Sequence, residues 1–98
     1  MPAESVSLKS MITASTEQIS SAVGDEAVIL DVKRGVYHGL DPTGARIWEL
    51  IQQRGRTVAE LRDAILAEYD VEPERCERDI LALMRALADK GLIDVTDA

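Results

Sequence analysis

The sequence is poor in the residues that most often perform catalysis or hold metal ions. It contains 1 Cys and 1 His, Cys76 and His38, so an internal disulfide is impossible. One Cys and one His cannot supply the usual four ligands of a zinc site. They could form a nucleophile and base pair, but no Asn or Asp is identifiable as its orienting third member. Since phosphate-cradling glycine loops are also missing, the sequence predicts a protein that is not an enzyme and has no metal or cofactor.

Long apolar runs and most aromatic residues are missing as well. Phe is absent and aromatic residues make up 3% of the chain, so the core should be aliphatic. No apolar run approaches the roughly 18 residues that a membrane span needs. The N-terminus does not have the basic and then apolar pattern of a secretory signal. We therefore expect a cytoplasmic protein that does not bind membranes.

Positive charge is scarce relative to negative charge. Lys and Arg number 11 against 18 Asp and Glu, which gives a formal net charge of -7. Such a surface repels a phosphate backbone, so nucleic acid is not expected as a partner. The carboxylates that crowd the second half of the chain are typical of solvated helix surfaces rather than of paired catalytic acids. At 98 residues the chain predicts a single domain over 1–98, with residues 1–5 frayed.

Alternating apolar residues in the first half predict an antiparallel sheet. Residues 27–32 form a β-branched run, a turn at Lys33, Arg34 and Gly35 follows, and residues 36–40 resume the alternation, so the two runs predict a hairpin. Residues 6–13 alternate more weakly and predict another strand. The Ser-rich segment 14–24 is ambiguous, because residues 16–23 fit either a short helix or a long connection.

Three helices are predicted in the second half, because each is preceded by a recognisable start signal. Asp41 followed by Pro42 suits a helix start, and Thr57 with Glu60 has the form of a capping box. Glu72 and Pro73 open the third helix, and Lys90 with Gly91 ends it. The expected helices run from 42 to about 53, from 57 to about 69 and from 73 to 90, and residues 92–95 predict a last strand. The fold class is therefore α+β.

Two surface features suggest that the domain binds a peptide. The strand at 36–40 is expected at a sheet edge, where unpaired amides and carbonyls can pair with an extended peptide. The third helix has an apolar arc wider than one packing face requires. Periodicity alone leaves open whether this arc walls a groove or is simply buried. Its central residues are Cys76, Ile80, Leu83 and Leu87.

Residues 25–95 resemble the PqqD-like family. The resemblance is carried by the order and spacing of several short motifs. They are AVILD at 27–31, GVYHGLD at 35–41, TGARIWEL at 43–50, TVAEL at 57–61, YDVEP at 69–73 and GLI at 91–93. The resemblance implies a winged-helix-like fold, with a three-stranded antiparallel sheet on the N-terminal side packed on a three-helix bundle.

The same resemblance implies a function. In this family the leader of a ribosomally synthesised precursor peptide adds as a strand beside the third strand, in the groove that this strand forms with the third helix. Carried over to this chain, the strand contacts would come from Val36, Tyr37, His38 and Gly39. The apolar wall would be Cys76, Ile80, Leu83 and Leu87, flanked by Arg75, Arg78 and Asp79.

The chain most resembles the stand-alone leader-binding proteins of lasso-peptide biosynthesis, which deliver the precursor to a separate leader peptidase. Three alternatives stay open from the sequence. One is a peptide chaperone of the PqqD type that serves a radical-SAM enzyme. Another is a winged-helix regulator that binds DNA, a role that the acidic charge of the chain disfavours. The third is an enzyme subunit that contributes one catalytic residue in trans, with Cys76 or His38 as the candidate.

Overall fold

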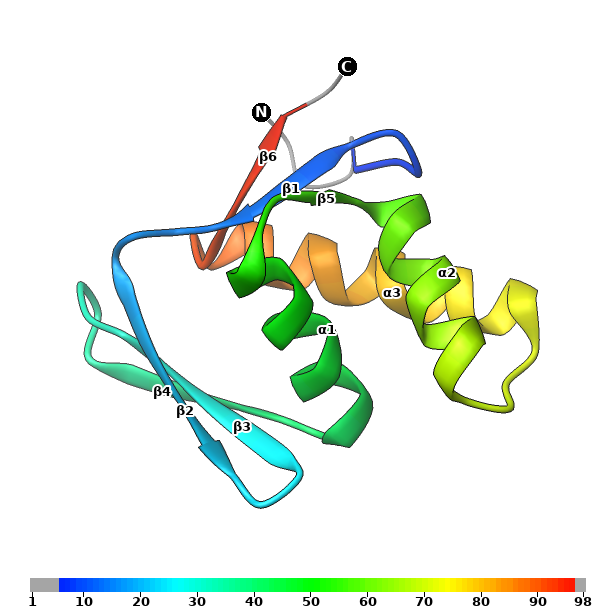
Figure 1. Ribbon diagram of the computed structural model, residues 1–98. Helices are drawn as coiled ribbons and strands as arrows, with labels where there is room; N and C mark the ends of the chain where they lie inside the picture. The colour runs from blue at the N-terminus through cyan, green and yellow to red at the C-terminus, as the bar shows by residue number, and fades with distance from the viewer. Residues whose placement is uncertain (1–5, 97–98) are drawn as a thin grey trace.

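The computed structural model describes residues 6–96, which form two small antiparallel sheets and three helices (Figure 1). One sheet has the strand order β2-β3-β4 and the other has the order β5-β1-β6. The expected frayed end, residues 1–5, lies outside the described residues. The strands are β1 (Met11–Ala14), β2 (Gln18–Val23), β3 (Glu26–Asp31), β4 (Val36–Leu40), β5 (Arg56–Thr57) and β6 (Ile93–Thr96), and the helices are α1 (Pro42–Gln53), α2 (Val58–Glu68) and α3 (Pro73–Asp89).

The hairpin of β3 and β4 forms as the sequence predicts. Gly35 has a φ of 67°, a left-handed conformation that costs glycine little. The carboxylate of Asp31 accepts hydrogen bonds from the amides of Lys33 and Arg34, both at 3.1 Å. Asp31 is 4% exposed, and its buried side chain is satisfied by the hydrogen bonds that hold the turn. The two strands then pair from Asp31 opposite Val36 to Ala27 opposite Leu40.

Most of the Ser-rich segment is a strand, β2, so the interpretations of residues 16–23 as a short helix or as a long connection are wrong. β2 pairs along its whole length with β3, from Gln18 opposite Asp31 to Val23 opposite Glu26. Sequence periodicity missed this strand because most of its residues are exposed and carry no clear apolar alternation. β2 therefore takes the third place in the hairpin sheet.

The strand expected at 6–13 is shorter and belongs to the other sheet. Residues 7–10 form a turn, in which the Ser10 amide donates to the Ser7 carbonyl at 3.1 Å. β1 then pairs with β6 and with the two residues of β5. The terminal strand predicted at 92–95 is confirmed as β6. The sequence thus predicted an α+β fold correctly, but it did not show that the strands divide into two sheets.

The helices begin and end where their capping signals predicted. The Asp41 carboxylate accepts a hydrogen bond from the Gly44 amide at 2.8 Å, at the start of α1. In the capping box of α2, the Thr57 hydroxyl accepts from the Glu60 amide at 3.1 Å and the Glu60 carboxylate accepts from the Thr57 amide at 2.9 Å. α3 begins at Pro73, and Gly91 follows its end with a φ of 72°.

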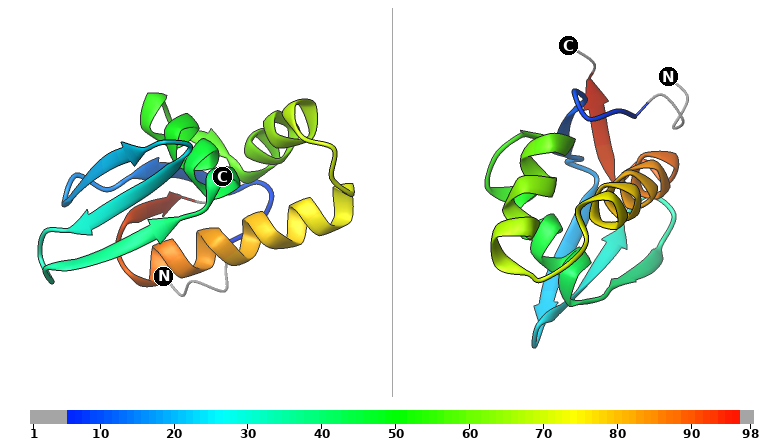
Figure 2. Two further views of the ribbon diagram at one scale, coloured as in Figure 1. Left: turned by 90° about the horizontal axis from the view of Figure 1, so that it is seen from below. Right: turned by 90° about the vertical axis from the view of Figure 1, so that its right-hand side faces the viewer.

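The hydrophobic core lies where α1 packs between the hairpin sheet and the other helices (Figures 1 and 2). Trp48 and Ile47 of α1 are 2% and 3% exposed, and they share this core with Ile29 of β3 and Met84 of α3. Within residues 6–96, no helix has the length and apolar character needed to cross a membrane.

Candidate functional site

β4 is an edge strand whose free side carries unpaired backbone groups. In the order β2-β3-β4, its neighbour on one side is β3 and the other side is open. Just beyond the ends of β2 and β3, the amide of Val32 donates to the main-chain carbonyl of Glu17 at 3.4 Å. Backbone groups alternate in direction along a strand, so the even-numbered residues of β3 direct their amides toward β2. The odd-numbered residues then direct theirs toward β4, where their partners are Val36, His38 and Leu40. By this alternation, the backbone groups of Tyr37 and Gly39 point to the open edge.

The side chains of β4 alternate between the two faces of the sheet. Leu40 and His38 lie opposite Ala27 and Ile29, which are buried against the helices, so this face of β4 points inward. Tyr37 points to the outer face and is 69% exposed. An extended peptide beside β4 would alternate in the same way.

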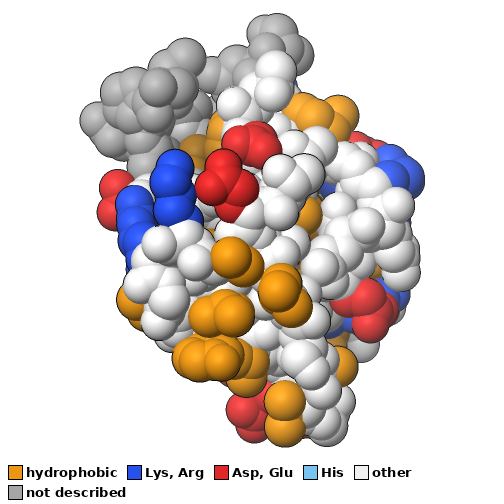
Figure 3. Space-filling view, turned by 90° about the vertical axis from the view of Figure 1, so that its left-hand side faces the viewer, with side chains coloured by type: hydrophobic (Ala, Val, Ile, Leu, Met, Phe, Trp, Pro, Cys, Tyr) orange, Lys and Arg blue, Asp and Glu red, His pale blue; other side chains and the backbone are white. Residues whose placement is uncertain are grey.

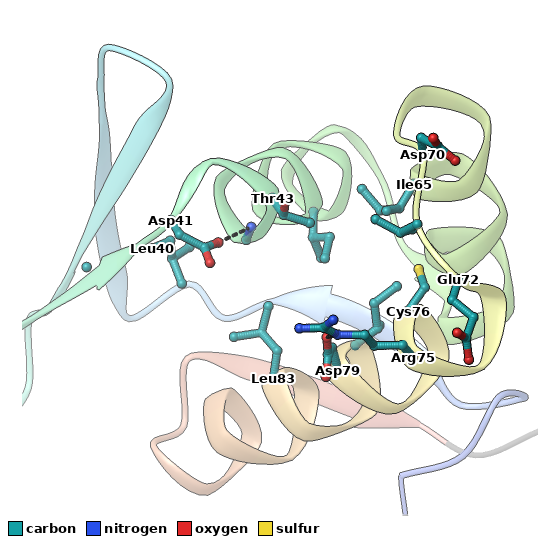
Figure 4. Close-up of a pocket in the computed structure, with 15 residues that line it drawn as sticks. Leu40, Asp41, Thr43, Ile65, Asp70, Glu72, Arg75, Cys76, Asp79 and Leu83 are labelled. Carbon is teal, nitrogen blue, oxygen red and sulfur yellow. Dashed lines mark hydrogen bonds and ion pairs between the residues drawn. The ribbon is translucent and has the colours of Figure 1, made fainter.

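A cavity of about 890 Å³ lies next to the open edge, between the end of β4, the start of α1 and the N-terminal half of α3 (Figure 4). Its floor is apolar, because it is formed by the side chains of Ile47, Ile65 and Ile80. These side chains are between 1% and 3% exposed. Leu40 and Leu83 approach it from opposite walls. Its lining residues are Gly39, Leu40, Asp41, Thr43, Gly44, Ile47, Ile65, Asp70, Val71, Glu72, Arg75, Cys76, Asp79, Ile80 and Leu83.

Ion pairs hold the helices around this cavity. The guanidinium of Arg46 on α1 lies 2.9 Å from the carboxylate of Glu68 on α2, and its hydrogen bonds hold the pKa of Glu68 below the usual range. Arg62 on α2 contacts Glu77 on α3 at 2.9 Å. Each pair is partly exposed and therefore contributes modestly to stability. Together they connect the three helices from which most of the cavity is built.

The rim of the cavity is charged and predominantly acidic. Asp41, Asp70, Glu72 and Asp79 surround it, with Arg75 as the basic residue among its lining (Figure 4). The guanidinium of Arg75 lies 3.8 Å from the carboxylate of Asp79, and both side chains are mostly exposed. A charged rim around an apolar floor suits a peptide with an apolar anchor and polar residues on either side.

Cys76 lies in the wall of the cavity, but its environment does not activate it. Burial raises the pKa of the Cys76 thiol, and the charge of Asp79 adds to this effect. A thiol whose pKa is raised is a poor nucleophile, because the thiolate is the reactive form. His38 is not among the lining residues. Within residues 6–96, no cluster of His, Cys, Asp and Glu side chains is suited to hold a metal ion.

The structure brings together six of the predicted site residues at the cavity, namely Gly39, Arg75, Cys76, Asp79, Ile80 and Leu83. Val36, Tyr37 and His38 lie along the same edge strand but outside the cavity lining. Arg78 is exposed and is not part of the lining. Leu87 is 3% exposed and packs in the core, so the predicted apolar wall ends before it. Direct contact between any of these residues and a peptide stays a prediction.

Sequence reasoning missed the residues that reach the cavity from outside β4 and α3. Ile47 and Ile65 were visible as apolar positions on α1 and α2, but periodicity cannot distinguish a cavity floor from an ordinary core. Asp70, Val71 and Glu72 come from the connection between α2 and α3. Their place at the rim depends on the angle between these helices, for which the sequence carries no local signal.

The opposite edge of the sheet, formed by β2, has a smaller cavity beside it. A smaller cavity of about 440 Å³ lies between β2 and α1. There the amide of Gln52 on α1 donates to the hydroxyl of Ser20 on β2 at 2.8 Å, which links the helix to the edge strand. The indole nitrogen of Trp48 is buried in this region without a hydrogen-bond partner. The edge of β4, with the larger cavity beside it, is therefore the better candidate for strand addition.

Fold and site together define a small α+β domain in which an open sheet edge faces an apolar cavity. The family model described as coenzyme PQQ synthesis protein D (PqqD) matches residues 26–93, and the chain belongs to this family. It is similar to a solved structure described as TbiB1 in complex with the TbiA(β) leader peptide. The two are 40% identical, with a TM-score of 0.78, over 84% of this chain and 94% of that chain.

The chain is also similar to a structure described as lasso peptide synthetase B1 complexed with the leader peptide. The identity is 28% and the TM-score 0.73, over 85% of this chain and 96% of that chain. No match was found among curated protein sequences. The predicted family resemblance is therefore confirmed, and the structures most relevant to the candidate site are complexes with leader peptides.

Proposed function

We propose that this chain binds the leader of a ribosomally synthesised precursor peptide as an additional strand beside β4. The observation that carries the proposal is the open edge of β4 next to an apolar cavity of about 890 Å³. The backbone groups of Tyr37 and Gly39 would pair with the peptide, and backbone pairing would supply affinity without specifying sequence. One apolar side chain of the leader would occupy the cavity and fix the register.

The role that follows is recruitment in the cytoplasm. The chain would hold the precursor, and a separate leader peptidase would cleave it, as in a lasso-peptide pathway. The two similar structures support the lasso type, since both are described as leader-peptide complexes and one as a lasso peptide synthetase component. The family description leaves a chaperone role for a radical-SAM enzyme as the alternative pathway for the same binding activity.

A DNA-binding role is disfavoured by the surface of α3. A helix that reads DNA presents basic and amide side chains to phosphates and bases. Here the cavity side of α3 exposes Asp79 beside Arg75, and Glu72 precedes the helix. With a net charge of -7 for the whole chain, the balance favours a peptide over a phosphate backbone.

The proposal is tested by amide hydrogen exchange with and without a synthetic leader from the nearest precursor gene. The amides of Tyr37 and Gly39 should exchange quickly in the free domain and slowly when the leader is bound. The amide of His38 faces β3 and should be protected in both states. Protection that appears instead along β2 would place the peptide at the opposite edge, and no change anywhere would contradict leader binding.

A further inference from the structure

The side of the cavity that lies across from Leu40 is acidic. It is formed by the connection between α2 and α3, where Asp70, Val71 and Glu72 line the cavity (Figure 4). All three residues are exposed. We call these three residues the acidic wall. On the face of the molecule shown in Figure 3, by contrast, acidic and basic side chains are interspersed.

Within residues 6–96, neither carboxylate of the acidic wall forms an ion pair. The other carboxylates at the rim are engaged, since Asp41 caps α1 and Asp79 lies 3.8 Å from the guanidinium of Arg75. Arg46 and Arg62, on α1 and α2, are paired with glutamates of α2 and α3. The two carboxylates of the wall are therefore left to water or to a ligand.

The cation that suits the acidic wall is the side chain of a basic residue rather than a metal ion. Within the described part of the chain, no group of His, Cys, Asp and Glu side chains could hold a metal. Hard divalent cations need several oxygen ligands at once. An ammonium or guanidinium group, in contrast, forms a charge-assisted hydrogen bond with a single carboxylate.

The geometry of the edge strand brings a bound leader to this wall. β4 ends at Leu40 and α1 begins at Pro42, so outward backbone pairing ends at Gly39. A leader that continues beyond Gly39 would leave the sheet and cross the mouth of the cavity, because Gly39 and Leu40 are part of its lining. Its anchor side chain would fill the apolar floor, and a neighbouring residue would reach the acidic wall. Covering the carboxylates without a cation would cost free energy, because water is removed from them.

We propose that the acidic wall selects leaders that carry a Lys or Arg next to the apolar anchor. This inference rests on the proposed leader binding and adds the charge of the substrate to it. The basic group of the leader would pair with Asp70 and Glu72 while the anchor fills the cavity. Because both carboxylates are exposed in the free domain, the contact would contribute to selectivity and to the rate of association more than to affinity.

The test combines charge changes on the domain with charge changes on the leader. The wall variant, Asp70→Asn with Glu72→Gln, removes the charge of the wall and keeps the shapes of both side chains. Asp25→Asn with Glu26→Gln removes the same charge from exposed residues near the opposite edge and is the matched control. The probes are a synthetic leader from the nearest precursor gene and copies in which each Lys and Arg is replaced singly by Gln. Fluorescence titration at low and high salt measures the affinities.

With the wild-type domain, a Gln substitution next to the anchor should lower leader affinity about threefold to tenfold at low salt, and high salt should reduce this difference. The same leader substitution should have no effect with the wall variant, because its partner is gone. The control variant should behave like the wild type.

Equal affinity of the original leader for the wild type and the wall variant at low salt would overturn the proposal. It would also be overturned if no Lys or Arg of the leader affected binding to the wild type. Failure of the wild type to bind the leader at all would instead contradict the proposed function.

Discussion

The guanidinium of Arg34 donates a hydrogen bond to the main-chain oxygen of Lys90, at 3.2 Å, and so connects the tip of the β3-β4 hairpin to the end of α3. The bond joins residues 56 positions apart in the sequence. It closes one end of the space between β4 and α3, while the cavity lies toward the other end, near Gly39 and Asp79. The bond therefore links the hairpin next to the edge strand to the end of the helix that an added strand would face.

Arg34→Ala should weaken leader binding more than it weakens the fold. Arg34 is exposed, so the loss in unfolding free energy should be no more than about 1 kcal/mol. Leader affinity should fall about threefold to tenfold, because the hairpin would have to be ordered during binding. Lys33→Ala is the control, since the ammonium of Lys33 pairs with the exposed carboxylate of Glu17, 3.8 Å away, rather than with the end of α3. Fluorescence titration and urea unfolding measure the two effects, and equal affinity in both variants would contradict this role.

Cys76 provides a probe of the cavity that requires no substitution. Burial raises the pKa of its thiol, so alkylation by iodoacetamide should be slow near neutral pH and should accelerate only above the usual thiol range. Saturating leader should slow the reaction further, because the anchor side chain would cover the sulfur. The rate is followed by mass spectrometry. A rate that is independent of leader would show that the peptide does not enter the cavity.

Leu83→Asp should reduce leader affinity about tenfold or more. Leu83 is half-buried in the cavity wall, where a carboxylate would be desolvated by the incoming anchor. Ala82→Asp adds the same charge at the neighbouring exposed position, outside the lining, and should leave affinity unchanged. Ile80 is less suitable for this test, because at 2% exposure a charge there would unfold the domain. Equal titration curves for the two variants would place the anchor elsewhere.

The capping box of α2 makes a prediction about stability and pH. The pKa of Glu60 is lowered, first by the hydrogen bond from the Thr57 amide, then by the hydrogen bond with the Thr57 side chain and by the charge of Arg54. A lowered folded-state pKa contributes stability above the unfolded value of 4.5, and this contribution is lost as the pH falls through the folded value. Glu60→Gln should therefore be less stable than the wild type at pH 7, with a smaller difference at pH 3. Urea unfolding of both proteins at pH 7 and pH 3 measures the two stabilities. The same difference in unfolding free energy at both pH values would contradict this prediction.

The sequence predicted those parts of the fold that have a local chemical signal. Asp41, Thr57 and Gly91 mark helix ends because capping and left-handed geometry each require a particular residue type. The β3-β4 hairpin was visible because residues 27–32 are a β-branched run and Lys33, Arg34 and Gly35 supply a turn directly after it. β2 was missed because most of its residues are exposed and its half-buried Gln18 and Ser20 are polar, so it has no apolar alternation. Its pairing with β3 determines its structure, and pairing is not a local property.

The candidate site was predicted in part, and the division follows the same principle. The edge strand and the wall formed by Cys76 and Leu83 lie on elements with clear patterns. The cavity floor at Ile47 and Ile65 depends on how three helices meet. Leu87 was assigned to the wall because it shares the helical face of Ile80, whereas the structure buries it in the core. A helical wheel gives the direction of a side chain but not what lies opposite.

The most direct test of strand addition is a titration of fluorescent leader into the wild type, Gly39→Ala and Gly39→Pro. A Cβ at Gly39 meets nothing within 4 Å, so Gly39→Ala should bind like the wild type. Proline lacks the amide that points to the open edge, and at an edge position it should leave the β3-β4 pairing intact. We predict that Gly39→Pro stays folded and loses leader affinity by about tenfold or more. Leader binding of undiminished affinity in a folded Gly39→Pro variant would contradict strand addition at β4.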